Sequence, residues 1–163
     1  MPGGRHRFPA GVQDFFAGET ASAVAGGVTT VGDFAYPAGT RFELEYERKR
    51  TCLESQALCD FLLHTVVRSF DQLAEAATRT VKVFLSASGL GAKSGIGLGL
   101  VEKAMAKGHQ VLVHVEDMDD YLAIARLILA SPGAGPVHIL HVPHQRHSRL
   151  MRGLVEERLT LET

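Results

Sequence analysis

The sequence predicts an α/β fold, in which a parallel sheet is arranged as an incomplete (β/α) barrel of the TIM type. Short apolar runs alternate with longer segments in which apolar residues recur at helical spacing. Strands that alternate with helices form parallel sheets through right-handed crossovers, and strands buried on both faces are apolar throughout. An open doubly wound sheet has the same periodicity. The barrel is favoured because several runs end in His or Asp, and functional side chains of barrels stand at the carboxyl ends of strands.

Seven runs have the length and composition of strands. They cover residues 5–8, 28–34, 61–67, 81–86, 110–117, 137–143 and 159–163. Helical periodicity fills the intervals, in residues 14–27, 42–60, 69–79, 99–108, 120–131 and 145–158. A closed barrel has eight strands, so we expect one partial barrel domain over residues 1–163.

Composition limits the classes of function. The chain of 163 residues is 45% hydrophobic and 21% charged, which suits one globular domain. Its formal net charge of -1 gives no electrostatic basis for binding nucleic acid or an anionic membrane. No apolar run is long enough to span a bilayer, and the first residues lack a signal-peptide core. With Cys52 and Cys59 as the only cysteines, we expect no disulfide framework and a cytoplasmic location.

In four of the strand-like runs, a residue that can bind a metal ion or transfer a proton stands at or near the carboxyl end. These residues are Asp33, His64, His114 and His141. A single histidine at a strand end is more often a hydrogen-bonded structural residue than a ligand. His114 and His141 stand at matching positions on successive strands, however, and imidazoles from neighbouring strands can share one divalent metal. Metal ligation is therefore as good an interpretation as a structural role for this pair.

Lys82 lies inside an apolar run, between Val81 and Val83. A bare ammonium group is costly to bury, so a buried Lys82 must be paired, deprotonated or chemically altered. The alternative is a lysine near the end of a strand whose amine reaches solvent.

Five segments in this order resemble the cyclic amidohydrolases, the group of dihydropyrimidinase, hydantoinase and dihydroorotase: AGGVTTVGDF, CDFLLH, VKVF, HVED and HILHV. CDFLLH and VKVF favour the first two enzymes. The resemblance covers nearly the whole chain. It implies hydrolysis of a small cyclic amide, a dihydropyrimidine or hydantoin ring, to an N-carbamoyl amino acid.

The resemblance also implies a metal site. Two divalent cations, usually zinc, would be bridged by a carboxylated Lys82, with His114 and His141 as further ligands. Formation of a carbamate would convert the amine, which is costly to bury as a cation, into an anionic ligand. The metal ions would lower the pKa of water and polarise the ring carbonyl.

Several departures from the family predict weak or absent catalysis. The family's first strand carries Asp-x-His-x-His, whereas Arg5 and Arg7 occupy the positions of the metal histidines here, and only a gap lets His6 serve as a ligand. Arginine cannot ligate a cation. The family's tyrosine after the bridging lysine is missing. The chain also ends before the strand that carries the catalytic aspartate and before the outer β domain, so no catalytic residue is assigned.

Three interpretations of these losses stay open: a fragment of an ordinary enzyme, a non-catalytic relative kept as a scaffold for assembly, and a compact active variant. Because a truncated barrel exposes edge strands, we expect a homo-oligomer.

A phosphate- or nucleotide-binding domain is the alternative from another class. It rests on the glycine-rich segment GLGAKSGIGLG, residues 89–99, ahead of a helix, because glycines let backbone N–H groups approach a phosphate. The P-loop requires Gly-Lys-Ser/Thr in sequence, and Ala92 separates Gly91 from Lys93 here.

Overall fold

The computed structural model describes residues 15–36, 42–76, 78–85, 96–142, 144–154 and 158–162. The predicted strand at 5–8, which contains the candidate ligand His6, lies outside the described residues, as does most of the glycine-rich segment. The chain divides into two compact units, Met1–His64 and Thr65–Thr163.

Helices and strands alternate along the chain, as the sequence predicts. The elements are α1 (Phe15–Ala25), β1 (Thr30–Ala35), α2 (Phe42–Gln56), β2 (Asp60–Val66), α3 (Phe70–Glu75), β3 (Thr80–Phe84), α4 (Gly97–Ala106), β4 (Gln110–His114), α5 (Met118–Ala130), β5 (Val137–Leu140), α6 (Gln145–Leu154) and β6 (Leu159–Leu161). The strands follow the order β1-β2-β3-β4-β5-β6, and β2 to β6 pair in parallel. The α/β class and the parallel sheet are confirmed. Within the described residues the sheet is open, because the order places β1 and β6 at its two ends.

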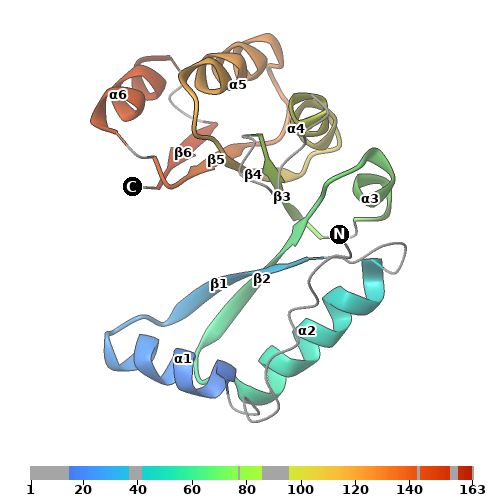
Figure 1. Ribbon diagram of the computed structural model, residues 1–163, viewed down its shortest axis with the longest axis vertical. Helices are drawn as coiled ribbons and strands as arrows, with labels where there is room; N and C mark the ends of the chain where they lie inside the picture. The colour runs from blue at the N-terminus through green and yellow to red at the C-terminus, as the bar shows by residue number, and fades with distance from the viewer. Residues whose placement is uncertain are drawn as a thin grey trace, which may run out of the picture. The chain divides into compact units, whose positions relative to one another are not determined.

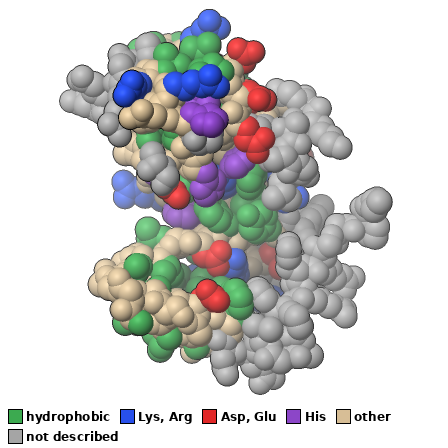
Figure 2. All heavy atoms as spheres, turned by 60° about the vertical axis from the view of Figure 1, so that its left-hand side comes forward, with side chains coloured by type: hydrophobic (Ala, Val, Ile, Leu, Met, Phe, Trp, Pro, Cys, Tyr) green, Lys and Arg blue, Asp and Glu red, His purple; other side chains and the backbone are tan. Residues whose placement is uncertain are grey.

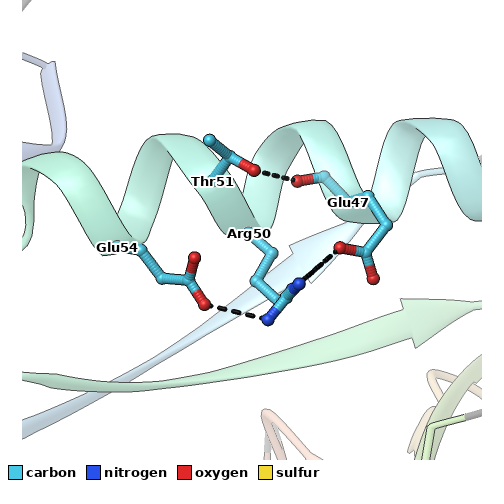
Figure 3. Close-up of polar contacts among 4 residues, drawn as sticks. All are labelled: Glu47, Arg50, Thr51 and Glu54. Carbon is cyan, nitrogen blue, oxygen red and sulfur yellow. Dashed lines mark hydrogen bonds and ion pairs between the residues drawn. The ribbon is translucent and has the colours of Figure 1, made fainter.

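The first unit is built from α1, β1, α2 and most of β2. Its apolar cluster consists of Phe16, Ala35, Leu53 and Leu63, with Tyr46, Cys52 and Phe61 packed against it. The opposite side of α2 is charged and solvated: Arg50 forms ion pairs with Glu47 at 2.6 Å and Glu54 at 2.9 Å (Figure 3). Such pairs, three and four residues apart, support the helix. Cys52 and Cys59 are free thiols.

The second unit is a parallel sheet with helices packed along it. Figure 1 shows α4, α5 and α6 along one side of β3 to β6, and α4 contacts both β3 and β4. Side chains alternate between the two faces of a strand, so the register sorts them into two sets. The first set is fully buried: Val81, Val83, Val111, Val113, Val137 and Ile139. These valines and the isoleucine supply the hydrophobic core against the helices.

Helix ends in the second unit are satisfied by specific residues. Gly108 follows α4 in the left-handed region, at φ 82°, and donates to the carbonyl of Met105 at 3.0 Å. Glycine adopts this conformation without steric cost. At the end of α5, the guanidinium of Arg158 donates to the carbonyls of Ile128 and Ser131. A cation there also complements the negative end of the helix dipole. No helix in the described ranges is both long and apolar enough to cross a bilayer.

Candidate functional site

The second face of the sheet in the unit Thr65–Thr163 carries the polar side chains. It alternates with the valine face along β3 to β6, and we call it the Lys82 face. Its members are Lys82, Phe84, Leu112, His114, His138, Leu140, Thr160 and Glu162. Figure 2 shows histidine side chains gathered on one face of the molecule beside acidic ones.

Lys82 is buried, with 2% of its surface exposed. Its Nζ atom lies 4.8 Å from the centre of the Phe84 ring. Burial lowers the pKa of Lys82 from 10.5 to about 8, and the negative charge of Glu162 partly opposes this shift. The interpretation of Lys82 as a lysine that reaches solvent is therefore wrong. A buried amine with such a pKa is partly neutral, and hence nucleophilic, close to physiological pH.

His114 and His141 lie close together, as the sequence predicts. His114 is the last residue of β4 and His141 follows β5 directly. Their ring centres are 5.7 Å apart, and the His114 ring lies 5.5 Å from that of Phe84. The Nε2 atom of His114 is 2.9 Å from a carboxylate oxygen of Glu116. Lys82 thus lies two residues before the end of β3, His114 ends β4 and His141 follows β5, three consecutive strands of the sheet.

The backbone at His141 is unusual. Its φ is 55°, the only positive φ of a residue other than glycine in the described part of the chain. Histidine is found in the left-handed region more often than most residues, yet the conformation still carries a steric cost. Its side chain is 61% exposed. Local strain of this kind is concentrated at functional sites.

Two further residues of the Lys82 face, which the sequence analysis did not single out, surround His141. The carboxylate of Glu162 lies 3.7 Å from Nδ1 of His141 and 3.6 Å from Nε2 of His138. Nδ1 of His138 in turn lies 2.6 Å from the hydroxyl oxygen of Thr160. The signal that could have found them is alternation, because His138 stands opposite Leu112 and Leu112 opposite Lys82.

Asp33 and His64 do not stand at strand ends, so this part of the prediction is wrong. Each lies two residues before the end of its strand, β1 or β2. The carboxylate of Asp33 is 2.8 Å from the amine of Lys49. The His64 ring lies 5.6 Å from that of Phe34. These contacts give both residues structural partners within the unit Met1–His64.

The described residues contain no group of three or more His, Cys, Asp or Glu side chains placed to hold a metal ion. Lysine is outside that set of residue types. The Lys82 face carries the buried amine of Lys82, the imidazoles of His114 and His138 and the carboxylate of Glu162, and the imidazole of His141 lies next to it. The assignment of His6 as a ligand, and the phosphate-binding interpretation of residues 89–99, stay predictions because His6 and residues 89–95 lie outside the described ranges.

No protein-family model matches the sequence, and no curated protein matches it either. The fold, however, is that of part of the cyclic amide hydrolases of known structure. A crystal structure of D-hydantoinase superposes with a TM-score of 0.71 at 20% identity over 91% of this chain. The dihydropyrimidinase from Brevibacillus agri NCHU1002 gives 0.65 at 21% identity over 92%, and the D-hydantoinase from Bacillus sp. AR9 gives 0.66 at 19% identity over 92%.

This chain spans 41% to 42% of the length of those structures. At such identities the likeness establishes the fold. The resemblance to the cyclic amidohydrolases is thus confirmed at the level of fold.

Proposed function

We propose that the sheet belongs to a (β/α) barrel of the amidohydrolase type and that its Lys82 face carries part of a metal-dependent site for hydrolysing a ring amide. The observation that carries this proposal is the burial of Lys82, 2% exposed, on the strand next to the one that ends at His114, whose ring centre lies 5.7 Å from that of His141. The fold shared with D-hydantoinase and dihydropyrimidinase structures supports the choice of reaction.

The donor types suit a divalent cation such as zinc. His114 and His141 supply imidazole nitrogens. The neutral amine of Lys82 attacks carbon dioxide, forms an N–C bond and releases a proton to solvent, which gives a carbamate. With a pKa of about 8, Lys82 has a neutral fraction available for this step at neutral pH. The carbamate replaces a costly buried amine with an anionic oxygen ligand.

A bound cation would supply water of lowered pKa and polarise the amide carbonyl. Hydrolysis adds water across the ring amide: the carbonyl carbon gains a hydroxyl, the C–N bond breaks, and the ring nitrogen takes a proton. A dihydropyrimidine or a hydantoin then opens to an N-carbamoyl amino acid. The chain's own contribution is to hold the lysine and the two imidazoles on, or directly after, three consecutive strands.

The test measures zinc binding by calorimetry with and without bicarbonate, together with ring opening of dihydrouracil and hydantoin. We expect bicarbonate to strengthen zinc binding in the wild type and to have no effect on Lys82→Met. We expect slow ring opening, because Arg5 and Arg7 stand where the family has metal histidines. Mass spectrometry under native conditions should find one carbon dioxide added at Lys82.

Lys103→Met is the matched control, because Lys103 is an exposed lysine on α4. This variant should keep the bicarbonate effect. Zinc binding that is absent, or that ignores bicarbonate, would contradict the proposed site and would favour a non-catalytic scaffold. A turnover rate typical of enzymes would instead refute the expectation of slow catalysis.

A further inference from the structure

Four polar side chains form a connected series that runs from the Lys82 face to His141, between β5 and the end of β6. Thr160 contacts His138 at 2.6 Å, His138 contacts one oxygen of Glu162 at 3.6 Å, and the other oxygen of Glu162 lies 3.7 Å from His141. Each imidazole nitrogen named here has its own partner. Glu162 therefore bridges two imidazoles with two different oxygen atoms.

One protonation pattern satisfies every contact in the series. The hydroxyl of Thr160 donates to Nδ1 of His138, which leaves the proton of His138 on Nε2, facing Glu162. The second carboxylate oxygen lies 3.7 Å from Nδ1 of His141, an ion-pair contact longer than a hydrogen bond, and its negative charge favours the proton on this nitrogen. In this pattern the Nε2 atom of His141 carries a lone pair, and that is the form in which an imidazole binds a metal.

The backbone gives a second reason for a tether at His141. Its ring is 61% exposed and its φ is 55°, so it stands outside the regular strand with little surrounding packing. One neighbour of the ring is that of His114, whose centre lies 5.7 Å away. The carboxylate of Glu162 is the acidic group in contact with it among the described residues. Glu162 is itself held by His138, which is only 24% exposed.

We propose that Glu162 is a positioning residue for His141: anchored by His138 and Thr160, it fixes the ring through Nδ1 and turns Nε2 toward the cation. This inference rests on the proposed function, in which His141 is a metal ligand. Histidines that bind metals commonly donate their other N–H to a carboxylate, which sets the tautomer and the orientation of the ring.

The first test reads the tautomer of His141 by 15N NMR of the metal-free chain. We expect the proton on Nδ1 in the wild type and a shift of the population toward Nε2–H in Glu162→Ala. Glu162→Gln should be intermediate, since its amide oxygen keeps a partial negative charge near Nδ1 but the full carboxylate charge is lost. Glu102→Gln, which changes an exposed glutamate on α4, should leave the tautomer as it is.

The second test measures zinc affinity in the same variants. Loss of the tether should weaken binding in Glu162→Ala by roughly 10- to 100-fold. The Gln variant should lose less, and Glu102→Gln should match the wild type. Circular dichroism checks that the variants are folded, which is expected because the side chain of Glu162 is 49% exposed.

The outcomes separate this inference from the proposed function. A tautomer shift without zinc binding in the wild type would support the positioning role and refute the metal site. Zinc binding that weakens while the tautomer stays unchanged would overturn the inference, because Glu162 would then act as a ligand itself. An unchanged tautomer and unchanged affinity in Glu162→Ala would overturn it as well.

Discussion

At Lys82, folding buries an amine that carries a positive charge in water. Folding leaves 2% of its surface exposed, and burial lowers its pKa from 10.5 to about 8. Between these pH values the unfolded chain binds a proton at Lys82 that the folded chain has released. The free energy of unfolding therefore rises as the pH rises from about 8 to about 10. Below about pH 8 both states carry the proton, and the folded state bears the full cost of the buried charge.

We predict that Lys82→Met removes this rise. In buffer free of metal and carbon dioxide, the variant should be more stable than the wild type near neutral pH, by on the order of 3 kcal/mol. The difference should shrink toward about pH 10. Urea titrations at several pH values measure it. A wild-type stability that falls across this interval relative to Lys82→Met would contradict the prediction.

His141 is the residue at which the backbone bears strain. At φ 55° a β-carbon costs on the order of 1 kcal/mol, and glycine does not carry this cost. We therefore predict that His141→Gly is more stable than His141→Ala by about 1 kcal/mol in urea unfolding. At Arg126, exposed on α5, the same pair of substitutions should have the opposite order, because glycine weakens helices. Equal stability of the two His141 variants would refute the left-handed conformation.

The sequence predicts some of the site and misses the rest for a physical reason. Lys82, His114 and His141 are found because a charge in an apolar run and a polar strand end are visible along one strand. His138 and Glu162 become neighbours of His141 only through the pairing of β5 with β6. Packing between strands sets the register of this pair. The periodicity of one strand does not predict which residues of two strands lie side by side.

At the scale of elements, the sequence predicts the order and type of the helices and strands in the described residues correctly and places several ends too late. The run at 110–117 contains a strand that stops at His114, although Val115 is 1% exposed. The run at 137–143 likewise stops at Leu140, although Val142 is 7% exposed. A run of apolar residues indicates burial, but a strand also needs backbone hydrogen bonds to its neighbours. Buried residues of the following loop therefore make the predicted strand longer than the observed one.

Asp33 and His64 show the opposite error. The strands β1 and β2 continue two residues beyond these side chains, to Ala35 and Val66. The prediction took these two polar residues as the ends of their strands. The predicted ends therefore lie two residues before the observed ones.

In the segment between α5 and β5, Gly135 lies too close to a neighbouring loop for a β-carbon to fit. A β-carbon on Gly135 would lie 2.1 Å from the carbonyl oxygen of His109, closer than any real contact. We predict that Gly135→Ala lowers the free energy of unfolding by about 1–3 kcal/mol or more, because the backbone must shift. Chemical denaturation measures the change.

Gly18 provides the comparison for the same substitution. It lies in α1, and a β-carbon there would meet nothing within 4 Å. Gly18→Ala should therefore stabilise the chain by roughly 0.5–1 kcal/mol, since alanine favours the helix. A neutral effect of Gly135→Ala would show that the turn adjusts without cost.

At the scale of the whole molecule, the fold survives at a sequence identity of 19% to 21% to the solved structures. What the chain keeps is the pattern rather than the residues: apolar strands, amphipathic helices and a polar edge to the sheet. Patterns of this kind largely decide fold class. Chemistry depends instead on individual side chains, so each residue of the site needs its own test.

The division into Met1–His64 and Thr65–Thr163 predicts two openings rather than one. Leu53, 1% exposed, belongs to the cluster of the first unit, and Val113, 0% exposed, to the sheet of the second. Units with separate cores open with separate free energies in native-state hydrogen exchange. Leu53→Ala should lower the opening free energy of α1 and α2 amides by about 2–5 kcal/mol and leave β4 and β5 amides protected. Val113→Ala should act mainly on β4 and β5. If Leu53→Ala instead lowers protection equally in both sets of amides, the chain opens as one cooperative body.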